Sequence, residues 1–150
     1  MSRPRVLLAD DHRIVAEGLK GLLEPEFELI EIVENGRALV DATKRVRPDV
    51  IVADISMPEL NGIDALMLLK RDDPDVRVVF LTMHRDVNYA RRAIEAGGLG
   101  FVLKHAATRE LVLALRAAKG CAPCPHDSES WPARFAHIIL RAVCVPRCLR

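Results

Sequence analysis

The stretch Val50-Ile51-Val52-Ala53-Asp54 decides the fold, because four small or branched apolar residues are followed at once by a carboxylate. A continuous apolar run of this length is typical of a strand that is buried on both faces of a parallel sheet. Residues 55–62 then have the composition of a loop, with Pro58 and Gly62 as turn signals. Ligands bind beside the carboxyl ends of the strands in such sheets, so we expect Asp54 at that edge.

The rest of residues 1–120 repeats the pattern of a strand followed by a helix. We expect the other strands over residues 6–9, 27–33, 76–81 and 99–103, and helices over residues 14–23, 38–46, 63–69, 87–94 and 108–118. Thr108 is the predicted N-cap of the last helix. The first helix is expected to pack against the core through Ile14, Val15, Leu19 and Leu22. Five such units predict an α/β domain, with helices on both faces of a parallel sheet and right-handed crossovers.

Composition and charge narrow the class of protein. The chain has 150 residues, of which 50% are hydrophobic and 29% charged, as in ordinary soluble domains. A formal net charge of +1 gives no general signal for binding nucleic acid or membranes. No apolar run is as long as a membrane span, and the N-terminal residues lack the apolar region of a signal peptide. We therefore expect a cytoplasmic protein with one domain over residues 1–120 and a tail over residues 121–150.

Polar residues that could take part in a reaction or bind an ion follow four of the five predicted strands. They are Asp10 with Asp11, Asp54, Thr82 and Lys104. Because parallel strands all end at the same edge of a sheet, these side chains are expected to meet there. Crowded carboxylates repel one another and favour a bound cation, and oxygen ligands suit Mg²⁺. A carboxylate nucleophile, a divalent metal and a lysine together indicate phosphoryl transfer to Asp54.

Each of these residues, like Phe101 in the last predicted strand, also has a plainer interpretation. Asp10-Asp11 alone would more often cap a helix, Thr82 would be a turn residue and Phe101 a core residue. The whole set, rather than any one member, favours a site. His12 and His84 lie beside the predicted site, where each either tunes the lifetime of a bound phosphate or is merely solvated.

The set resembles the receiver domain of a bacterial two-component response regulator over residues 5–119. The resemblance is carried by Asp10, Asp11, Asp54, Met57, Pro58, Gly62, Thr82, Phe101 and Lys104. It implies a flavodoxin-like (βα)5 sheet with the strand order 2-1-3-4-5. Residues 11–19 and 100–106 are most similar to the LuxR/NarL-FixJ-type subgroup, whose receivers precede a helix-turn-helix.

The resemblance also implies a role for each site residue. Asp54 would be the phospho-acceptor, while Lys104 and Thr82 would contact the phosphoryl oxygens. The Mg²⁺ ligands would be Asp11 directly, Asp10 largely through water, Asp54 itself and the backbone carbonyl of Ser56. Thr82 and Phe101 would form the switch pair that reports phosphorylation. The protein would then be a signalling switch that catalyses only its own phosphorylation and dephosphorylation, not an enzyme with a separate substrate.

The resemblance implies a sensor histidine kinase as the partner, and transcription as the output that the phosphorylated switch would control. Solvent-facing residues of the first helix would dock the kinase. Tyr89, Ala90 and Arg92 fall where such domains commonly form homodimers, although the sequence does not decide this. We expect this chain to make no direct contact with nucleic acid or membrane. Many receivers have a proline after the lysine, and His105 occupies that position here, which leaves the geometry of its peptide bond open.

The tail over residues 121–150 contains all four cysteines of the chain. Cys121, Cys124, Cys144 and Cys148 could bind zinc, with His126 or His137 as further ligands, or the first two could act as a redox pair. Residues 133–145 could form one helix, but no recognition helix with its turn is evident. Our preferred hypothesis is an altered tail, for example a frameshift product that lacks the helix-turn-helix output domain.

Two rival functions remain to be weighed. A metal-dependent phosphatase or hydrolase with Asp54 as its nucleophile would normally carry a second Asp two residues later, and position 56 is Ser. A pseudo-receiver that acts only as a protein-interaction module would not need the complete acidic set and Lys104. Both observations favour the phosphorylatable switch.

Overall fold

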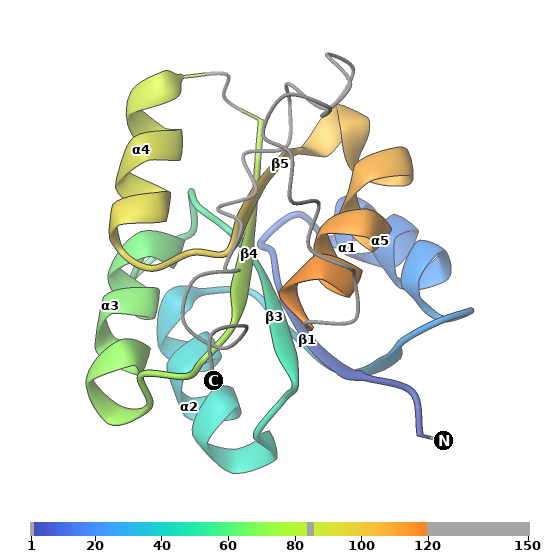
Figure 1. Ribbon diagram of the computed structural model, residues 1–150, viewed down its shortest axis with the longest axis horizontal. Coiled ribbons are helices and arrows are strands. Elements are labelled where there is room, and N and C mark those ends of the chain that lie inside the picture. Colours follow the sequence, from blue (N-terminus) through green and yellow to red (C-terminus); the bar gives the residue numbers. More distant parts are fainter. Residues whose placement is uncertain (1, 84–85, 120–150) are drawn as a thin grey trace, which may run out of the picture.

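Five parallel strands form one sheet at the centre of the computed structural model, which describes residues 2–83 and 86–119 (Figure 1). The strands are β1 (Arg5–Ala9), β2 (Glu28–Val33), β3 (Val50–Asp54), β4 (Val78–Thr82) and β5 (Gly100–Leu103). Their order is β2-β1-β3-β4-β5, which is the flavodoxin-like order. The predicted fold class is therefore confirmed.

Helices alternate with the strands and cover both faces of the sheet. They are α1 (Arg13–Leu23), α2 (Gly36–Val46), α3 (Gly62–Asp72), α4 (Val87–Glu95) and α5 (Ala107–Ala118), with a short 3-10 turn, η1 (Lys104–Ala106), before α5. Figure 1 shows α1 and α5 on one face and α2, α3 and α4 on the other. Two apolar layers result, because successive side chains of a strand point to opposite faces.

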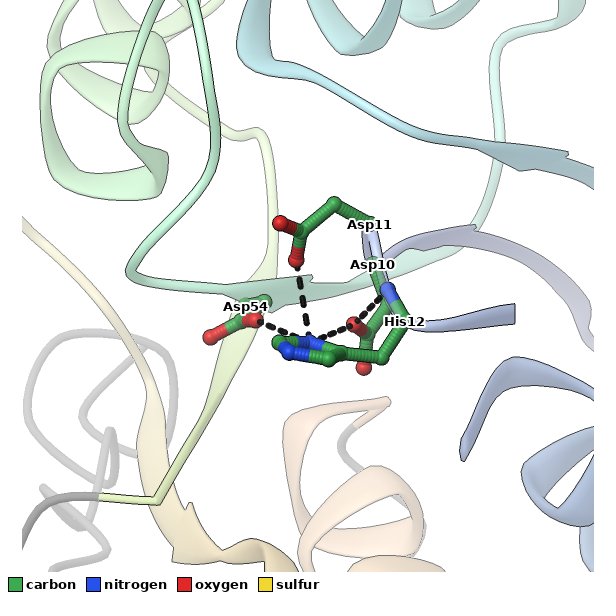
Figure 2. Close-up of side chains that lie close together, drawn as sticks. All are labelled: Asp10, Asp11, His12 and Asp54. Carbon is green, nitrogen blue, oxygen red and sulfur yellow. Dashed lines mark hydrogen bonds and ion pairs between the residues drawn. The ribbon is translucent and has the colours of Figure 1, made fainter. Parts of the chain in front are cut away.

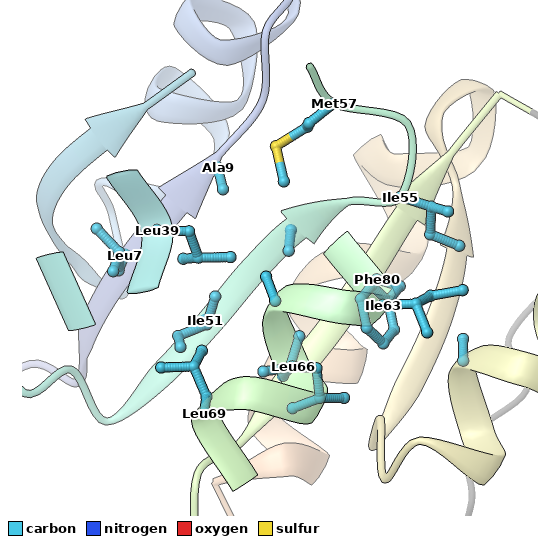
Figure 3. Close-up of a cluster of buried hydrophobic side chains, with 14 of the residues drawn as sticks. Leu7, Ala9, Leu39, Ile51, Ile55, Met57, Ile63, Leu66, Leu69 and Phe80 are labelled. Carbon is cyan, nitrogen blue, oxygen red and sulfur yellow. The ribbon is translucent and has the colours of Figure 1, made fainter. Parts of the chain in front are cut away.

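The alternation is visible within single strands. On β1, Leu7 and Ala9 join the layer under α2–α4, whereas Val6 and Leu8 join the layer under α1 and α5. Phe80 lies in the first of these layers, between strand and helix side chains (Figure 3). Every residue of β3 is buried, as expected for a strand covered on both faces.

Two predictions about helices are wrong. Ile14 does not face the core but is 90% exposed, whereas α1 buries Ala16, Leu19 and Leu23. Ile14 stands two residues before Ala16, which is about 200° around a helix of 3.6 residues per turn, so it points away from the sheet.

The predicted N-cap Thr108 is the second error, because α5 begins one residue earlier, at Ala107. Its N-cap residue is Ala106, with no side-chain hydrogen bond. The reason is that η1 leads from β5 directly into the helix, and the backbone N–H of Ala107 already donates to the carbonyl of Lys104. Local propensity for a side-chain cap is overridden by this continuous helical turn.

Side-chain caps do begin the helices on the other face. Asn35 caps α2 by accepting a hydrogen bond from the backbone N–H of Ala38, and Asn61 caps α3 through that of Asp64. Such caps satisfy N–H groups that lack partners within the helix. The α3 cap matters for the site, because it fixes where the loop after β3 ends.

Candidate functional site

Two buried carboxylates lie side by side at the carboxyl edge of the sheet. Asp54 is the last residue of β3, and Asp10 directly follows β1. Because Ala9 pairs with Ala53, the two strands reach this edge in step and bring Asp10 next to Asp54. Asp10 is 1% exposed and Asp54 3%, so both carboxylates are held away from bulk water. Burying an unpaired charge costs free energy, so the groups around these two carboxylates indicate how their charges are stabilised.

Lys104 supplies the positive charge between these carboxylates. Its Nζ lies 2.9 Å from Asp54 Oδ2 and 2.9 Å from Asp10 Oδ2, and it also donates to Asp10 Oδ1 at 3.1 Å. The side chain is 5% exposed. Lys104 comes from the turn after β5, fifty residues beyond Asp54 in the chain, so only the parallel sheet brings the two groups together. The convergence expected from the strand ends is observed for these three side chains.

The environment shifts the pKa values of this pair. Burial raises the pKa of Asp54 above its ordinary value of 3.8, in spite of the Lys104 hydrogen bond and charge that act to lower it, and nearby Asp10 adds to the increase. Burial alone would lower the pKa of Lys104, but hydrogen bonds to Asp10 and Asp54 outweigh it and raise that pKa above 10.5. Lys104 thus stays charged at neutral pH, whereas one ammonium group does not fully compensate the carboxylates.

Asp11 and His12 complete the cluster on its solvent side (Figure 2). The Nδ1 atom of His12 lies 3.1 Å from Asp11 Oδ1, 3.2 Å from Asp10 Oδ1 and 3.8 Å from Asp54 Oδ2. The His12 backbone N–H donates to Asp10 Oδ1 at 2.9 Å, which fixes the turn between β1 and α1. His12 is therefore part of the cluster, which residue order alone did not decide.

The residues present fit a divalent cation. One ligand atom from each of Asp10, Asp11, His12 and Asp54 can be chosen so that all lie within 4.8 Å of one another. Asp10 Oδ2 is fully buried and pairs with Lys104 Nζ at 2.9 Å, the same ammonium group that pairs with Asp54. Three acidic groups that share one lysine are short of positive charge, which a bound cation would supply.

The loop after β3 is held tightly against the end of that strand. The backbone N–H of Ser56 donates to Asp54 Oδ1 at 3.3 Å, and the N–H of Gly62 donates to the carbonyl of Ile55 at 2.9 Å. A Cβ atom on Gly62 would lie 2.2 Å from the carbonyl oxygen of Asp54, so only glycine fits there. Ser56 is thereby placed beside Asp54, while the role of its carbonyl group as a metal ligand stays a prediction.

The predicted switch residues lie on β4, which is next to β3, and on β5, the edge strand beyond it. Thr82 ends β4, 1% exposed, one residue after the Leu81 that pairs with Asp54. Phe101 is in β5, 4% exposed, and belongs to the apolar layer under α2–α4. Thr82 is thus at the same edge as Asp54, and the ring of Phe101 is packed inward. Their coupling stays a prediction.

Other predicted features divide between what the structure describes and what it leaves out. Ala90 is 3% exposed and packs into the core, so of the three residues expected at a homodimer surface only Tyr89 and Arg92 reach the exterior. The described residues contain no cis peptide bond, so the bond before His105 is trans. The tail over residues 121–150, with its zinc, redox and frameshift hypotheses, and His84 lie outside the described residues.

A flavodoxin-like sheet with acidic groups and a lysine at its carboxyl edge defines the class of protein, an α/β receiver. The family model of the response regulator receiver domain matches residues 6–116, so the chain belongs to this family, whose members are signalling switches.

Two comparisons place the chain further. It is 36% identical over 114 residues to the transcriptional regulatory protein DegU of Brevibacillus brevis, covering 75% of this chain and 48% of that protein. A LuxR-family response regulator from Aurantimonas has a TM-score of 0.76 and 32% identity, with 80% of this chain and 87% of that one covered.

A third similar structure is the isolated receiver domain of RcsB from Salmonella enterica, determined in the presence of the phosphomimetic BeF3⁻. It has a TM-score of 0.73 and 28% identity, and the match covers 79% of this chain and 90% of that one. The chain is thus homologous to response regulators of two-component systems that regulate transcription, although it spans about half the length of the regulators such as DegU that it matches.

No helix among the described residues is both long enough and apolar enough to span a bilayer.

Proposed function

We propose that this chain is a phosphorylatable switch in which Asp54 accepts a phosphoryl group from a phosphohistidine of a sensor kinase. The observation that carries the proposal is the pairing of a buried Asp54 with Lys104 at 2.9 Å, beside Asp10 and Asp11, at the mouth of a receiver sheet. Such a site offers one nucleophilic oxygen, one fixed positive charge and carboxylates that could hold a cation. These are the groups that phosphoryl transfer to a carboxylate requires.

The chemistry follows from the positions of these groups. An Asp54 carboxylate oxygen forms the new O–P bond while the P–N bond to the kinase imidazole breaks, and the imidazole nitrogen keeps the electron pair. Lys104 already lies within hydrogen-bonding distance of Asp54 Oδ2 and would neutralise an oxygen of the incoming group. Thr82, at the end of the adjacent strand, would donate its hydroxyl hydrogen to another.

Mg²⁺ is the proposed cofactor, held by Asp10, Asp11, Asp54 and the carbonyl of Ser56. When bound, it would offset the repulsion between the carboxylates and the negatively charged phosphoryl group. The proposal is supported by the oxygen-rich cluster and by the single ammonium group that Asp10 and Asp54 share. Asp10 also anchors the turn that carries Asp11 and His12.

Phosphorylation would shift the domain between two packings, with Thr82 and Phe101 as the reporting pair. A shift from about 1:99 to about 99:1 requires roughly 5.5 kcal/mol of differential stabilisation. The proposed output is transcription, because the matched DegU is a transcriptional regulatory protein and the Aurantimonas structure is a LuxR-family regulator. The RcsB receiver was studied with a phosphomimetic, which supports a phosphorylated form of the present chain.

Intact mass spectrometry tests the proposal. The full chain, incubated with Mg²⁺ and a small phosphodonor, should gain the mass of one phosphate. Asp54→Asn should gain none, because its amide is not a nucleophile. Asp72→Asn, at an exposed aspartate on α3, is the matched control and should be labelled like the wild type. Labelling of Asp54→Asn to the wild-type extent would remove Asp54 from its proposed role.

A further inference from the structure

We propose that His12 is a nitrogen ligand at the cation site, so that this receiver binds divalent transition-metal ions such as Co²⁺ more tightly than Mg²⁺. The inference rests on the metal site of the proposed function and adds a residue and a class of ion to it. It starts from the position of one ring atom: Nδ1 of His12 points at three carboxylates from two strands (Figure 2).

The distances around His12 Nδ1 are those between ligands of one ion. For a six-coordinate ion with bonds of about 2.1 Å, adjacent ligand atoms lie about 3.0 Å apart and opposite ones about 4.2 Å apart. Nδ1 lies 3.1 Å from Asp11 Oδ1 and 3.2 Å from Asp10 Oδ1, close to the adjacent spacing. Its 3.8 Å to Asp54 Oδ2 falls between the two. One ion could therefore contact all four groups after small side-chain rotations.

The backbone of His12 is held in place, whereas its side chain is free to rotate. Its backbone N–H is tied to Asp10 Oδ1, so the residue cannot drift away from the cluster. Its side chain is 57% exposed, so the ring can rotate and move Nδ1 by the few tenths of an ångström that coordination requires. Asp10, in contrast, has a fully buried side chain that shares the Lys104 ammonium group with Asp54. The shortage of positive charge among these carboxylates is the second sign that a cation belongs here.

The choice of ion follows from ligand chemistry. Mg²⁺ takes oxygen ligands and retains its waters, so an imidazole ligand adds little to its affinity for the site. Neutral imidazole suits Co²⁺, Ni²⁺ and Zn²⁺, whose affinities for a nitrogen-containing site exceed that of Mn²⁺. Lys104 Nζ lies 3.3 Å from His12 Nδ1 and disfavours every divalent cation alike. It therefore lowers all the affinities without changing the preference that His12 creates.

Calorimetric titration with Co²⁺ and with Mg²⁺ tests the inference in the full chain. The four tail cysteines are changed to Ser in every sample, so that thiolates do not compete for Co²⁺. His12→Ala should weaken Co²⁺ binding at least about tenfold and change Mg²⁺ binding less than about twofold. His105→Ala is the matched control, because His105 is an exposed histidine next to Lys104 and should leave both affinities unchanged.

Proton NMR of the Co²⁺-loaded protein gives a second readout. Imidazole ring protons shifted by a directly bound Co²⁺ should be present in the wild type and in His105→Ala, and absent in His12→Ala. The inference is overturned if the wild type binds Co²⁺ no more tightly than Mg²⁺. It is also overturned if His12→Ala retains the Co²⁺ affinity, or loses Co²⁺ and Mg²⁺ affinity by the same factor.

The same variants separate this inference from the proposed function. With Mg²⁺ and a small phosphodonor, the wild type and the His105→Ala control should each gain one phosphate by mass spectrometry. Unchanged Co²⁺ affinity in the His12→Ala protein, with the wild type phosphorylated as expected, would overturn the role of His12 alone. Absence of phosphate on the wild type would overturn the proposed function, whatever the metal titrations show.

Discussion

The middles of the five strands and their carboxyl ends are two contrasting regions of the same sheet. The middles are lined by Leu8, Val52 and Phe80, all 0% exposed and uncharged. The ends place Asp10, Asp54 and Lys104 in positions almost as buried, with side chains no more than 5% exposed. The middles are stabilised by removing apolar surface from water, an effect that has no preferred direction and needs no particular partner residue. The ends depend on a balance of charges, and among Asp10, Asp11, Asp54 and Lys104 that balance remains negative.

The largest expected loss of stability is in the middle of the sheet. Phe80→Ala should lower the free energy of unfolding by about 3–5 kcal/mol, because it removes a fully buried ring and leaves a cavity. Urea denaturation followed by circular dichroism measures this. Phe80→Leu is the control and should lose less, since most of the volume is kept. Equal losses for the two variants would show that the ring is not packed as described.

Lys104→Met tests the charge balance at the strand ends. Removing the ammonium while keeping the length of the side chain should cost about 3 kcal/mol at pH 7, because two buried carboxylates lose their counter-ion. The pKa of Lys104 is raised in the folded state, so its contribution is complete below 10.5 and is lost only as pH rises through the higher folded value.

The control for Lys104→Met is Lys44→Met. Lys44 forms a 3.0 Å ion pair with Asp72 in which both side chains are more than half exposed. Such a pair contributes about 0–1 kcal/mol. A Lys104→Met loss no larger than this would mean that the carboxylates at the strand ends do not need the lysine.

Asp54→Asn should change the free energy of unfolding in the opposite direction, and by less. Because burial raises the pKa of Asp54, the folded state binds a proton more readily than the unfolded state, and the wild type loses stability as pH rises from 3.8 through the folded value. Asn removes this loss, so the variant should be the more stable protein at pH 7, and the difference should shrink towards pH 3.5. Thermal unfolding at several pH values without divalent metal measures it; a less stable variant at pH 7 would contradict the raised pKa.

The smallest expected effect is at Ile14, which belongs to neither region. Ile14→Ala should change the free energy of unfolding by no more than about 0.5 kcal/mol, because the side chain is 90% exposed. Leu19→Ala on the same helix is the control and should cost about 2–5 kcal/mol, since Leu19 is 6% exposed. Chemical denaturation of both variants checks the facing of α1; similar losses would return Ile14 to the core.

Much of the fold could be predicted because its signals are local. The apolar runs before Asp10 and Asp54, and the helical stripes between them, alternate as a parallel sheet requires, and the expected strand order is observed. The errors arose where local signals compete with long-range packing. Ile14 satisfies a helical stripe as well as Ala16 does, but only the sheet decides which side is inside. Thr108 is a good cap residue, yet η1 makes a cap unnecessary.

The site was predictable to a different degree for each residue. Asp54 and Lys104 follow strands, and the common carboxyl edge of parallel strands brings them to 2.9 Å. His12 offered no such rule, because a histidine after two aspartates can point either to solvent or to the cluster. Its position depends on the turn that Asp10 Oδ1 forms with the His12 backbone, a contact that residue order does not reveal.

The amino-acid order alone determined which residues form strands, which of them carry polar groups at their ends, and hence which chemistry could assemble. The tertiary structure decided which helix faces turn inward, that His12 joins the carboxylates, and how deeply Asp10, Asp54 and Lys104 are buried. The physical reason is the distance along the chain over which each kind of interaction acts. Backbone propensity and hydrophobic periodicity act over a few residues, whereas burial and charge balance are set by groups that are fifty or more residues apart and meet only when the sheet forms.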